Sequence, residues 1–128
     1  MLTRKLLLIE DSSIQAKRLI FELEKSGFDV NWTRTLSEAK KAIEASKEID
    51  IILSDFEIEE EYSSTFFTIH RTYLEEKNIP FVIMSAHEDP HHLEIIHACR
   101  PHAFLSKPVL NSKLLSTIEN ILGIKNER

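Results

Sequence analysis

Five short apolar runs, separated by segments with helical spacing, constrain the fold of this chain more than any other feature. The runs span residues 5–9, 28–32, 49–53, 81–84 and 103–105. Their length and their content of Ile, Val, Leu and Phe predict five strands. The first, third and fourth runs are apolar without alternation, which is typical of strands covered on both faces of a parallel sheet. We therefore expect these three strands in the centre of the sheet.

The segments between the runs carry apolar residues at the spacing of amphipathic helices. Four clear stripes are Ala16, Leu19, Ile20 and Leu23; Leu36, Ala39 and Ile43; Phe66, Ile69 and Tyr73; and Leu114, Leu115, Ile118, Ile121 and Leu122. A thinner stripe of Leu93, Ile96 and Cys99 predicts a further helix between residues 89 and 99. Because strand-helix-strand crossovers are right-handed, this alternation predicts an α/β fold: a doubly wound parallel sheet of five strands with five helices.

Helix boundaries are marked by residues with known capping preferences. Thr35 and Glu38 have the spacing of a capping box, and Asn111 is placed to cap the last helix. Gly27 and Gly123 fall just past predicted helix ends, where a left-handed backbone is common.

Length and composition predict one domain over residues 1–128, because a chain of this size with 42% hydrophobic residues can bury one core. The net charge is -5, whereas nucleic-acid-binding domains usually carry a positively charged surface, so we expect no direct nucleic-acid partner. No apolar run approaches the ~20 residues of a membrane helix, and we expect no membrane contact. A single cysteine, Cys99, fits a reducing cytoplasmic location.

Polar side chains follow four of the predicted strands. They are Glu10, Asp11, Asp55, Ser85 and Lys107. In an open parallel sheet these carboxyl ends form the ligand-binding edge, so the five side chains should converge. Three close carboxylates repel one another unless a cation shares them, and oxygen-only ligands favour a hard ion such as Mg²⁺. A Ser85–Lys107 nucleophile pair is disfavoured, because no G-x-S-x-G elbow surrounds the serine.

The strings LLLIEDS, IILSDFE, FVIMSA and FLSKP occur in this order along the chain. Together they resemble the successive signatures of receiver domains, the chemotaxis-type response regulator domains of two-component signal transduction systems. The resemblance extends over essentially the whole chain. It implies a flavodoxin-like fold with strand order 2-1-3-4-5.

The resemblance also implies the role of each acidic residue. Asp55 would be the phosphorylated carboxylate, and Glu10 and Asp11 would hold Mg²⁺ together with it. Glu57 would contribute its backbone carbonyl to the same ion. A carboxylate is a competent nucleophile for phosphoryl transfer, and the metal neutralises the charge that accumulates on the transferring group.

Further residues match the family's phosphoryl-binding positions. Lys107 and the hydroxyl of Ser85 would contact phosphoryl oxygens, and the backbone amides of Phe56 and Ala86 would complete the cradle. The resemblance implies a cis peptide bond between Lys107 and Pro108.

Ser85 and Phe104 match the family's switch positions. We expect Ser85 to move toward a phosphoryl group and Phe104 to turn inward, which would change the surface of the fourth helix, fifth strand and fifth helix. Removal of the Ser85 hydroxyl should therefore uncouple signalling from phosphorylation.

As partners, the resemblance implies a sensor histidine kinase or histidine phosphotransfer protein, a downstream output domain or protein, and a phosphorylation-dependent homodimer. The domain would be no enzyme in the usual sense, because it would catalyse only its own phosphorylation and dephosphorylation. Two alternatives stay open: a pseudo-receiver that binds a partner without phosphorylation, and a small Mg²⁺-dependent phosphohydrolase.

The sequence departs from the family pattern after Asp55, where residues 58–64 read IEEEYSS and lack the usual proline and glycine. Glu57 and His87 occupy positions that, in the family, tune the lifetime of the phosphoryl group. His87, His91, His92, His97 and His102 crowd one region. We interpret them as solvated helix surface; a metal site or pH sensor is the alternative, since His87 and His91 have i,i+4 spacing.

Overall fold

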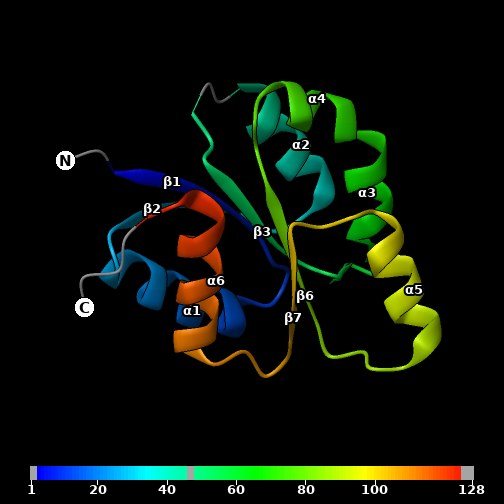
Figure 1. Ribbon diagram of the computed structural model, residues 1–128. Coiled ribbons are helices and arrows are strands. Elements are labelled where there is room, and N and C mark those ends of the chain that lie inside the picture. The colour runs from blue at the N-terminus through cyan, green and yellow to red at the C-terminus, as the bar shows by residue number, and fades with distance from the viewer. Residues whose placement is uncertain (1–2, 46–47, 125–128) are drawn as a thin grey trace.

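The computed structural model describes residues 3–45 and 48–124. Five parallel strands form the central sheet, in the order β2-β1-β3-β6-β7 (Figure 1). Their bounds are β1 (Arg4–Ile9), β2 (Phe28–Thr33), β3 (Ile51–Asp55), β6 (Phe81–Ser85) and β7 (Ala103–Ser106). Counted along the chain among these five, the order is 2-1-3-4-5, so the predicted topology is confirmed. The predicted domain limits, 1 and 128, lie outside the described residues.

Helices cover both faces of the sheet (Figure 1). They are α1 (Ser13–Lys25), α2 (Leu36–Ala45), α3 (Ser63–Ile69), α4 (Arg71–Glu76), α5 (Pro90–Ala98) and α6 (Asn111–Leu122). Buried residues of α1 and α6 pack against one face, and those of α2, α3, α4 and α5 against the other. Two-sided coverage explains why β3 and β6 are almost continuously apolar.

The described residues form six helices, so the prediction of five was wrong in number. The segment predicted as one helix from its Phe66, Ile69 and Tyr73 stripe is divided at His70. His70 has φ -96° and ψ 8°, outside the helical range, and it ends α3 and begins α4. Phe66 and Leu74 both still point into the same core.

The capping predictions had mixed outcomes. The Thr35 hydroxyl accepts a hydrogen bond from the Glu38 backbone N–H at 3.0 Å, as predicted. Gly123 adopts the left-handed conformation that ends α6. Asn111 does not cap that helix: it is the first helical residue, and its side-chain oxygen accepts from Arg18 instead.

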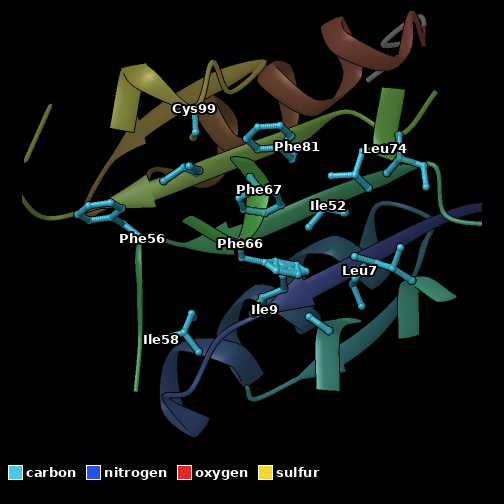
Figure 2. Packing of buried hydrophobic residues seen from close by; sticks show 14 of the residues in the cluster. Leu7, Ile9, Ile52, Phe56, Ile58, Phe66, Phe67, Leu74, Phe81 and Cys99 are labelled. Carbon is cyan, nitrogen blue, oxygen red and sulfur yellow. The ribbon is translucent and has the colours of Figure 1, made fainter. Parts of the chain in front are cut away.

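The core on the α2–α5 side is rich in aromatic rings (Figure 2). Phe67 of α3 stacks on Phe81 of β6, with ring centroids 4.1 Å apart. Phe56, which directly follows β3, is completely buried near the other end of this layer. The Phe67–Phe81 stack lies at the amino end of β6, whereas Phe56 packs beside the carboxyl end of β3, where Asp55 lies.

The acidic segment after Asp55 forms a hairpin that the sequence did not predict. Strands β4 (Glu57–Ile58) and β5 (Glu61–Tyr62) pair antiparallel across Glu59 and Glu60. Both turn residues have positive φ, 49° and 66°, as the two central residues of a type I′ turn require. Glutamate lacks glycine's freedom there, so the turn is strained.

None of the helices among the described residues has the length and apolar character that crossing a membrane requires.

Candidate functional site: an acidic pocket at the ends of β1 and β3

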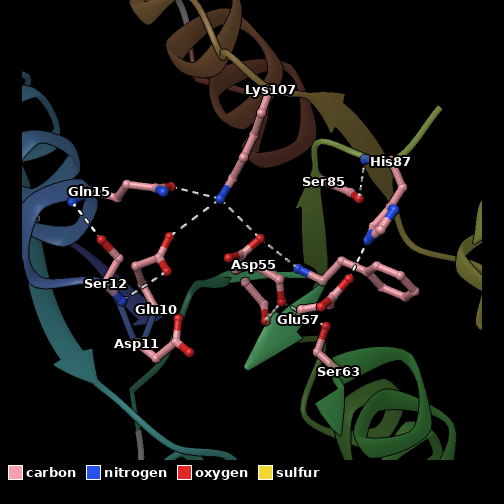
Figure 3. A network of polar contacts seen from close by, with 12 residues as sticks. Glu10, Asp11, Ser12, Gln15, Asp55, Glu57, Ser63, Ser85, His87 and Lys107 are labelled. Carbon is pink, nitrogen blue, oxygen red and sulfur yellow. Dashed lines mark hydrogen bonds and ion pairs between the residues drawn. The ribbon is translucent and has the colours of Figure 1, made fainter. Parts of the chain in front are cut away.

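Glu10, Asp11 and Asp55 come together at the carboxyl ends of β1 and β3 (Figure 3). The parallel register pairs Ile9 with Ser54, so the residues that follow, Glu10 and Asp55, emerge side by side. One carboxylate oxygen from each of the three residues lies within 4.8 Å of the other two. The sheet register therefore creates a three-carboxylate cluster, which we call the acidic pocket.

The charges of the acidic pocket are held at an energetic cost. Burial, followed by repulsion from Asp55, raises the pKa of Glu10 to about 7. Burial also raises the pKa of Asp55, although attraction to Lys107 acts in the opposite direction. Glu10 has no exposed surface, and within residues 3–45 and 48–124 its Oε1 accepts no hydrogen bond.

Lys107 places a positive charge beside two of the three carboxylates. Its Nζ lies 3.1 Å from Asp55 Oδ1 and 3.7 Å from Glu10 Oε1 (Figure 3). The same nitrogen donates a hydrogen bond to Gln15 Oε1 at 2.7 Å. The peptide bond between Lys107 and Pro108 is cis.

The acidic pocket has the chemistry of a Mg²⁺ site. Its donors are carboxylate oxygens, and Glu10 Oε1 is buried without a hydrogen-bond donor, so a cation would satisfy an atom that the protein leaves unsatisfied. Asp11 Oδ2 accepts a hydrogen bond from the backbone N–H of Glu59 at 2.9 Å, which joins the acidic pocket to the β4–β5 hairpin. Glu57 lies in β4, two residues after Asp55.

The other predicted phosphoryl-binding residues lie at the carboxyl ends of β3 and β6. The Phe56 backbone N–H donates to Asp55 Oδ1 at 2.9 Å. Ser85 is buried at the end of β6, and its Oγ accepts from the His87 backbone N–H at 3.0 Å. Ala86, which is exposed, and Lys107, which is partly buried, both line a cavity of about 370 Å³ between α1 and the segment after β7.

Phe104, the predicted aromatic switch residue, lies in β7 and is half-buried against the α2–α5 core. Its ring is 6.0 Å from the His97 ring of α5, centroid to centroid. Phe104 therefore lies beside α5. This helix corresponds to the fourth predicted helix, which is part of the expected switch surface.

Several supporting residues were not found from the sequence. The Ser63 hydroxyl donates to the Asp55 carbonyl at 2.8 Å, and the Trp32 indole N–H donates to the Glu10 carbonyl at 2.8 Å. Gln15 reaches Lys107 from the first turn of α1. They are ordinary helix and strand residues in the sequence, and only the tertiary fold brings them to the acidic pocket.

The histidine-rich region differs from its predicted arrangement. Helix α5 begins at Pro90, so His87 precedes the helix, and the i,i+4 relation to His91 has no structural meaning. His87 instead stacks on His92, with ring centroids 3.8 Å apart. His87 Nε2 also pairs with the Glu57 carboxylate on the side of Asp55 away from Glu10 and Asp11 (Figure 3).

The model of the response regulator receiver domain family matches residues 6–119. This chain therefore belongs to the response regulator receiver domain family. A search of curated proteins found no match.

Solved structures with the same fold are numerous. The receiver domain of a signal transduction histidine kinase from Syntrophus aciditrophicus superposes with a TM-score of 0.87 at 24% identity, covering 98% of this chain and 96% of the other. The chemotaxis response regulator CheY4 of Vibrio cholerae gives 0.82 at 21% identity, covering 94% and 99%. A CheY-like receiver protein of Methanospirillum hungatei gives 0.84 at 17%, covering 95% of each chain. At these identities the likeness concerns the fold.

Proposed function

We propose that this chain is a phosphoacceptor receiver domain that takes a phosphoryl group onto Asp55 with the help of Mg²⁺. The donor would be a histidine kinase or a histidine phosphotransfer protein in the cytoplasm, and the whole chain, residues 1–128, would form the one domain. The observation that carries this proposal is the convergence of Glu10, Asp11 and Asp55 with Lys107 in contact with Asp55.

The residues around Asp55 have complementary tasks in the proposed transfer. An Asp55 carboxylate oxygen attacks the phosphorus, the phosphorus–nitrogen bond to the donor imidazole breaks, and the imidazole leaves with the bonding electron pair. Bound Mg²⁺ would supply charge neutralisation of the phosphoryl oxygens. Lys107 and the Ser85 hydroxyl stabilise the same oxygens from the other side, and the amides of Phe56 and Ala86 donate hydrogen bonds to them.

Asp55 is prepared for this chemistry by its surroundings. Its Oδ1 contacts both the Lys107 ammonium at 3.1 Å and the Phe56 N–H at 2.9 Å. These two donors favour the ionised nucleophile against the effect of burial. On phosphorylation, the same donors are within reach of the new phosphoryl group.

The test is incubation of the protein with Mg²⁺ and acetyl phosphate, read by intact mass. We expect the mass of one added phosphoryl group in the wild type, and no addition in Asp55→Asn or without Mg²⁺. Asp29→Asn, which changes an exposed carboxylate at the opposite end of the sheet, is the matched control and should react normally. An unmodified wild-type protein would support a pseudo-receiver, and continuous release of phosphate with turnover would support the phosphohydrolase.

We further propose that Ser85 and Phe104 transmit the phosphorylated state to the surface of α5, β7 and α6, where an output partner or a second receiver would bind. Ser85 is buried and Phe104 is half-buried, so a change of packing at one can be accommodated at the other. Ser85→Ala should accept the phosphoryl group at Asp55 but lose phosphorylation-dependent partner binding or dimerisation. Size-exclusion chromatography with and without acetyl phosphate would detect the dimer, and full switching by Ser85→Ala would contradict this proposal.

A further inference from the structure

We propose that His87, Asp89 and His92 form a second metal site, separate from the acidic pocket, which takes a divalent transition metal ion of the zinc class. We call these three residues the histidine cluster. One ligand atom from each residue lies within 4.8 Å of the other two. Ligands of a tetrahedral zinc ion are about 3.3 Å apart. Because an imidazole binds a metal in the plane of its ring, the His87 and His92 rings would rotate out of their parallel stack to meet at one ion.

The ring nitrogens that face Asp89 are the two Nδ1 atoms. His92 Nδ1 lies 2.7 Å from Asp89 Oδ2, and His87 Nδ1 lies 3.7 Å from Asp89 Oδ1. The two rings stack nearly parallel, at an interplanar angle of 15°, which points their Nδ1 edges toward the same carboxylate. Two imidazoles and one carboxylate are a common set of three protein ligands for zinc, and they leave a fourth position for water.

The outer nitrogens of both rings already have the partners that metal-bound histidines usually have. His87 Nε2 contacts the Glu57 carboxylate, and His87 Nδ1 faces a second carboxylate, Asp89, at 3.7 Å. A carboxylate on the distal nitrogen is the arrangement that orients histidine ligands in metalloproteins.

His92 has a partner that accommodates both of its tautomers. Its Nε2 lies 3.0 Å from the Tyr62 hydroxyl, which can donate or accept a hydrogen bond. When His92 Nδ1 binds metal, its proton is carried on Nε2 and donated to the Tyr62 oxygen. Metal binding therefore requires no break in this contact.

The backbone holds the histidine cluster in place without blocking it. Asp89 is the N-cap of α5, and its Oδ2 accepts a hydrogen bond from the His92 backbone N–H at 3.1 Å. Its Oδ1 lies 2.8 Å from His92 Nδ1, a contact that a metal ion between the two atoms would replace. The side chains of His87, Asp89 and His92 retain 35%, 47% and 21% of their exposed surface, so an ion can enter from solvent. Imidazole nitrogen favours zinc, copper or nickel over Mg²⁺, so the two sites should select different ions.

Titration of the tag-free, full-length protein with Zn²⁺ in excess Mg²⁺ tests the proposal. We expect one Zn²⁺ per chain in the wild type and in Asp55→Asn, whose acidic pocket is altered. His87→Ala, His92→Ala and Asp89→Asn should each bind at least about tenfold more weakly, the size of loss typical when a metal site loses a supporting group. Asp89→Asn keeps a residue that caps helices well, so α5 should be preserved.

His91→Ala is the matched control, because His91 lies next to His92 on α5 but outside the histidine cluster. It should bind Zn²⁺ like the wild type. Equal affinity in wild type and in all three cluster variants, or a loss confined to Asp55→Asn, would overturn the proposal.

Imidazole nitrogen NMR of the wild-type protein gives a result that does not depend on how variants fold. Zn²⁺ should shift the Nδ1 resonances of His87 and His92 and leave those of His91 and His97 in place. Shifts at His91 or His97 instead of His87 and His92 would place the ion elsewhere and refute the assignment.

Discussion

The acidic pocket and the histidine cluster are linked by Glu57, which follows Asp55 by two residues and contacts His87, yet they are built in different ways. Glu10 and Asp55 come from the ends of central strands, and their side chains keep 0% and 15% of their exposed surface. The histidine cluster comes from a loop and the first turn of α5, and its side chains stay between about one-fifth and one-half exposed. The strand ends fix buried carboxylates at short range, whereas the loop offers accessible ligands.

This difference separates two ways of preparing a protein for a cation. In the acidic pocket, burial and mutual repulsion raise the pKa of Glu10 to about 7, so ionising the carboxylates is costly and a bound cation would relieve that cost. In the histidine cluster, each ring already has hydrogen-bonding partners, and the exposed carboxylates are solvated. Removal of a charge should therefore change stability more in the acidic pocket than in the histidine cluster.

The largest change in stability should come from substitution of Phe56, whose ring packs against His87 and His92 of the histidine cluster. The ring is fully buried, stacks on Tyr62 at 4.5 Å, and meets the edges of His87 and His92 at 5.9 and 6.1 Å between centroids. Phe56→Ala should lower the free energy of unfolding by about 3–5 kcal/mol, measured by urea denaturation.

The matched control for this substitution is Phe21→Ala, because Phe21 is 65% exposed on α1. Its cost should stay within about 0.5 kcal/mol. If Phe56→Ala were equally mild, the ring would not be the shared support of Tyr62 and the two histidines.

A smaller effect should follow from the titration of Glu10. Its pKa is raised from 4.5 to about 7 in the folded protein, so the stabilisation from its protonated form is fully present below pH 4.5 and is lost as pH rises through about 7. Without Mg²⁺, Glu10→Gln should therefore be more stable than wild type at about pH 8, by roughly 1–3 kcal/mol, and nearly equal to it at low pH.

Thermal unfolding across the pH range, with and without Mg²⁺, measures this difference. Mg²⁺ should stabilise the wild type at high pH more than Glu10→Gln, because it binds the ionised carboxylates. Glu24→Gln, which changes an exposed carboxylate on α1, serves as the control and should follow the wild type. A pH-independent difference between wild type and Glu10→Gln would contradict the charge repulsion described for the acidic pocket.

The smallest effect concerns the contact between the two regions. If Glu57 and His87 limit access of water to phosphorylated Asp55, replacing both by alanine should shorten the phosphoryl lifetime at least about threefold, or ~0.6 kcal/mol in the barrier. Decay of phosphoprotein measured by intact mass after removal of acetyl phosphate gives the lifetime. The double variant Glu88→Ala, His91→Ala removes one exposed glutamate and one exposed histidine nearby and should decay like the wild type.

The sequence alone predicted the sheet well, because continuous apolar runs are characteristic of strands buried on both faces. It also identified Glu10, Asp11, Asp55 and Lys107 as neighbours, since strand order alone brings strand ends together. It could not predict the β4–β5 hairpin, because two glutamates with positive φ give none of the usual turn signals.

The histidine cluster was missed for a related reason. Spacing within a helix suggested His87 and His91, whereas the start of α5 at Pro90 and the stacking of His87 on His92 depend on tertiary packing. Periodicity reports which residues share a helix face, and it carries no information about a loop residue that folds back onto that helix.

Phe56 performs two tasks that draw on different parts of the same residue. Its main-chain N–H contacts Asp55 Oδ1, and its carbonyl accepts from the Ser63 N–H at 2.7 Å, while its ring faces Tyr62 and the histidines. Every amino acid except proline has a main-chain N–H that can donate to Asp55 Oδ1. Proline is therefore the one residue at position 56 that would lose this contact. Substitution of the side chain at position 56 can therefore change the packing against Tyr62 and the histidines and leave the main-chain contact with Asp55 unchanged.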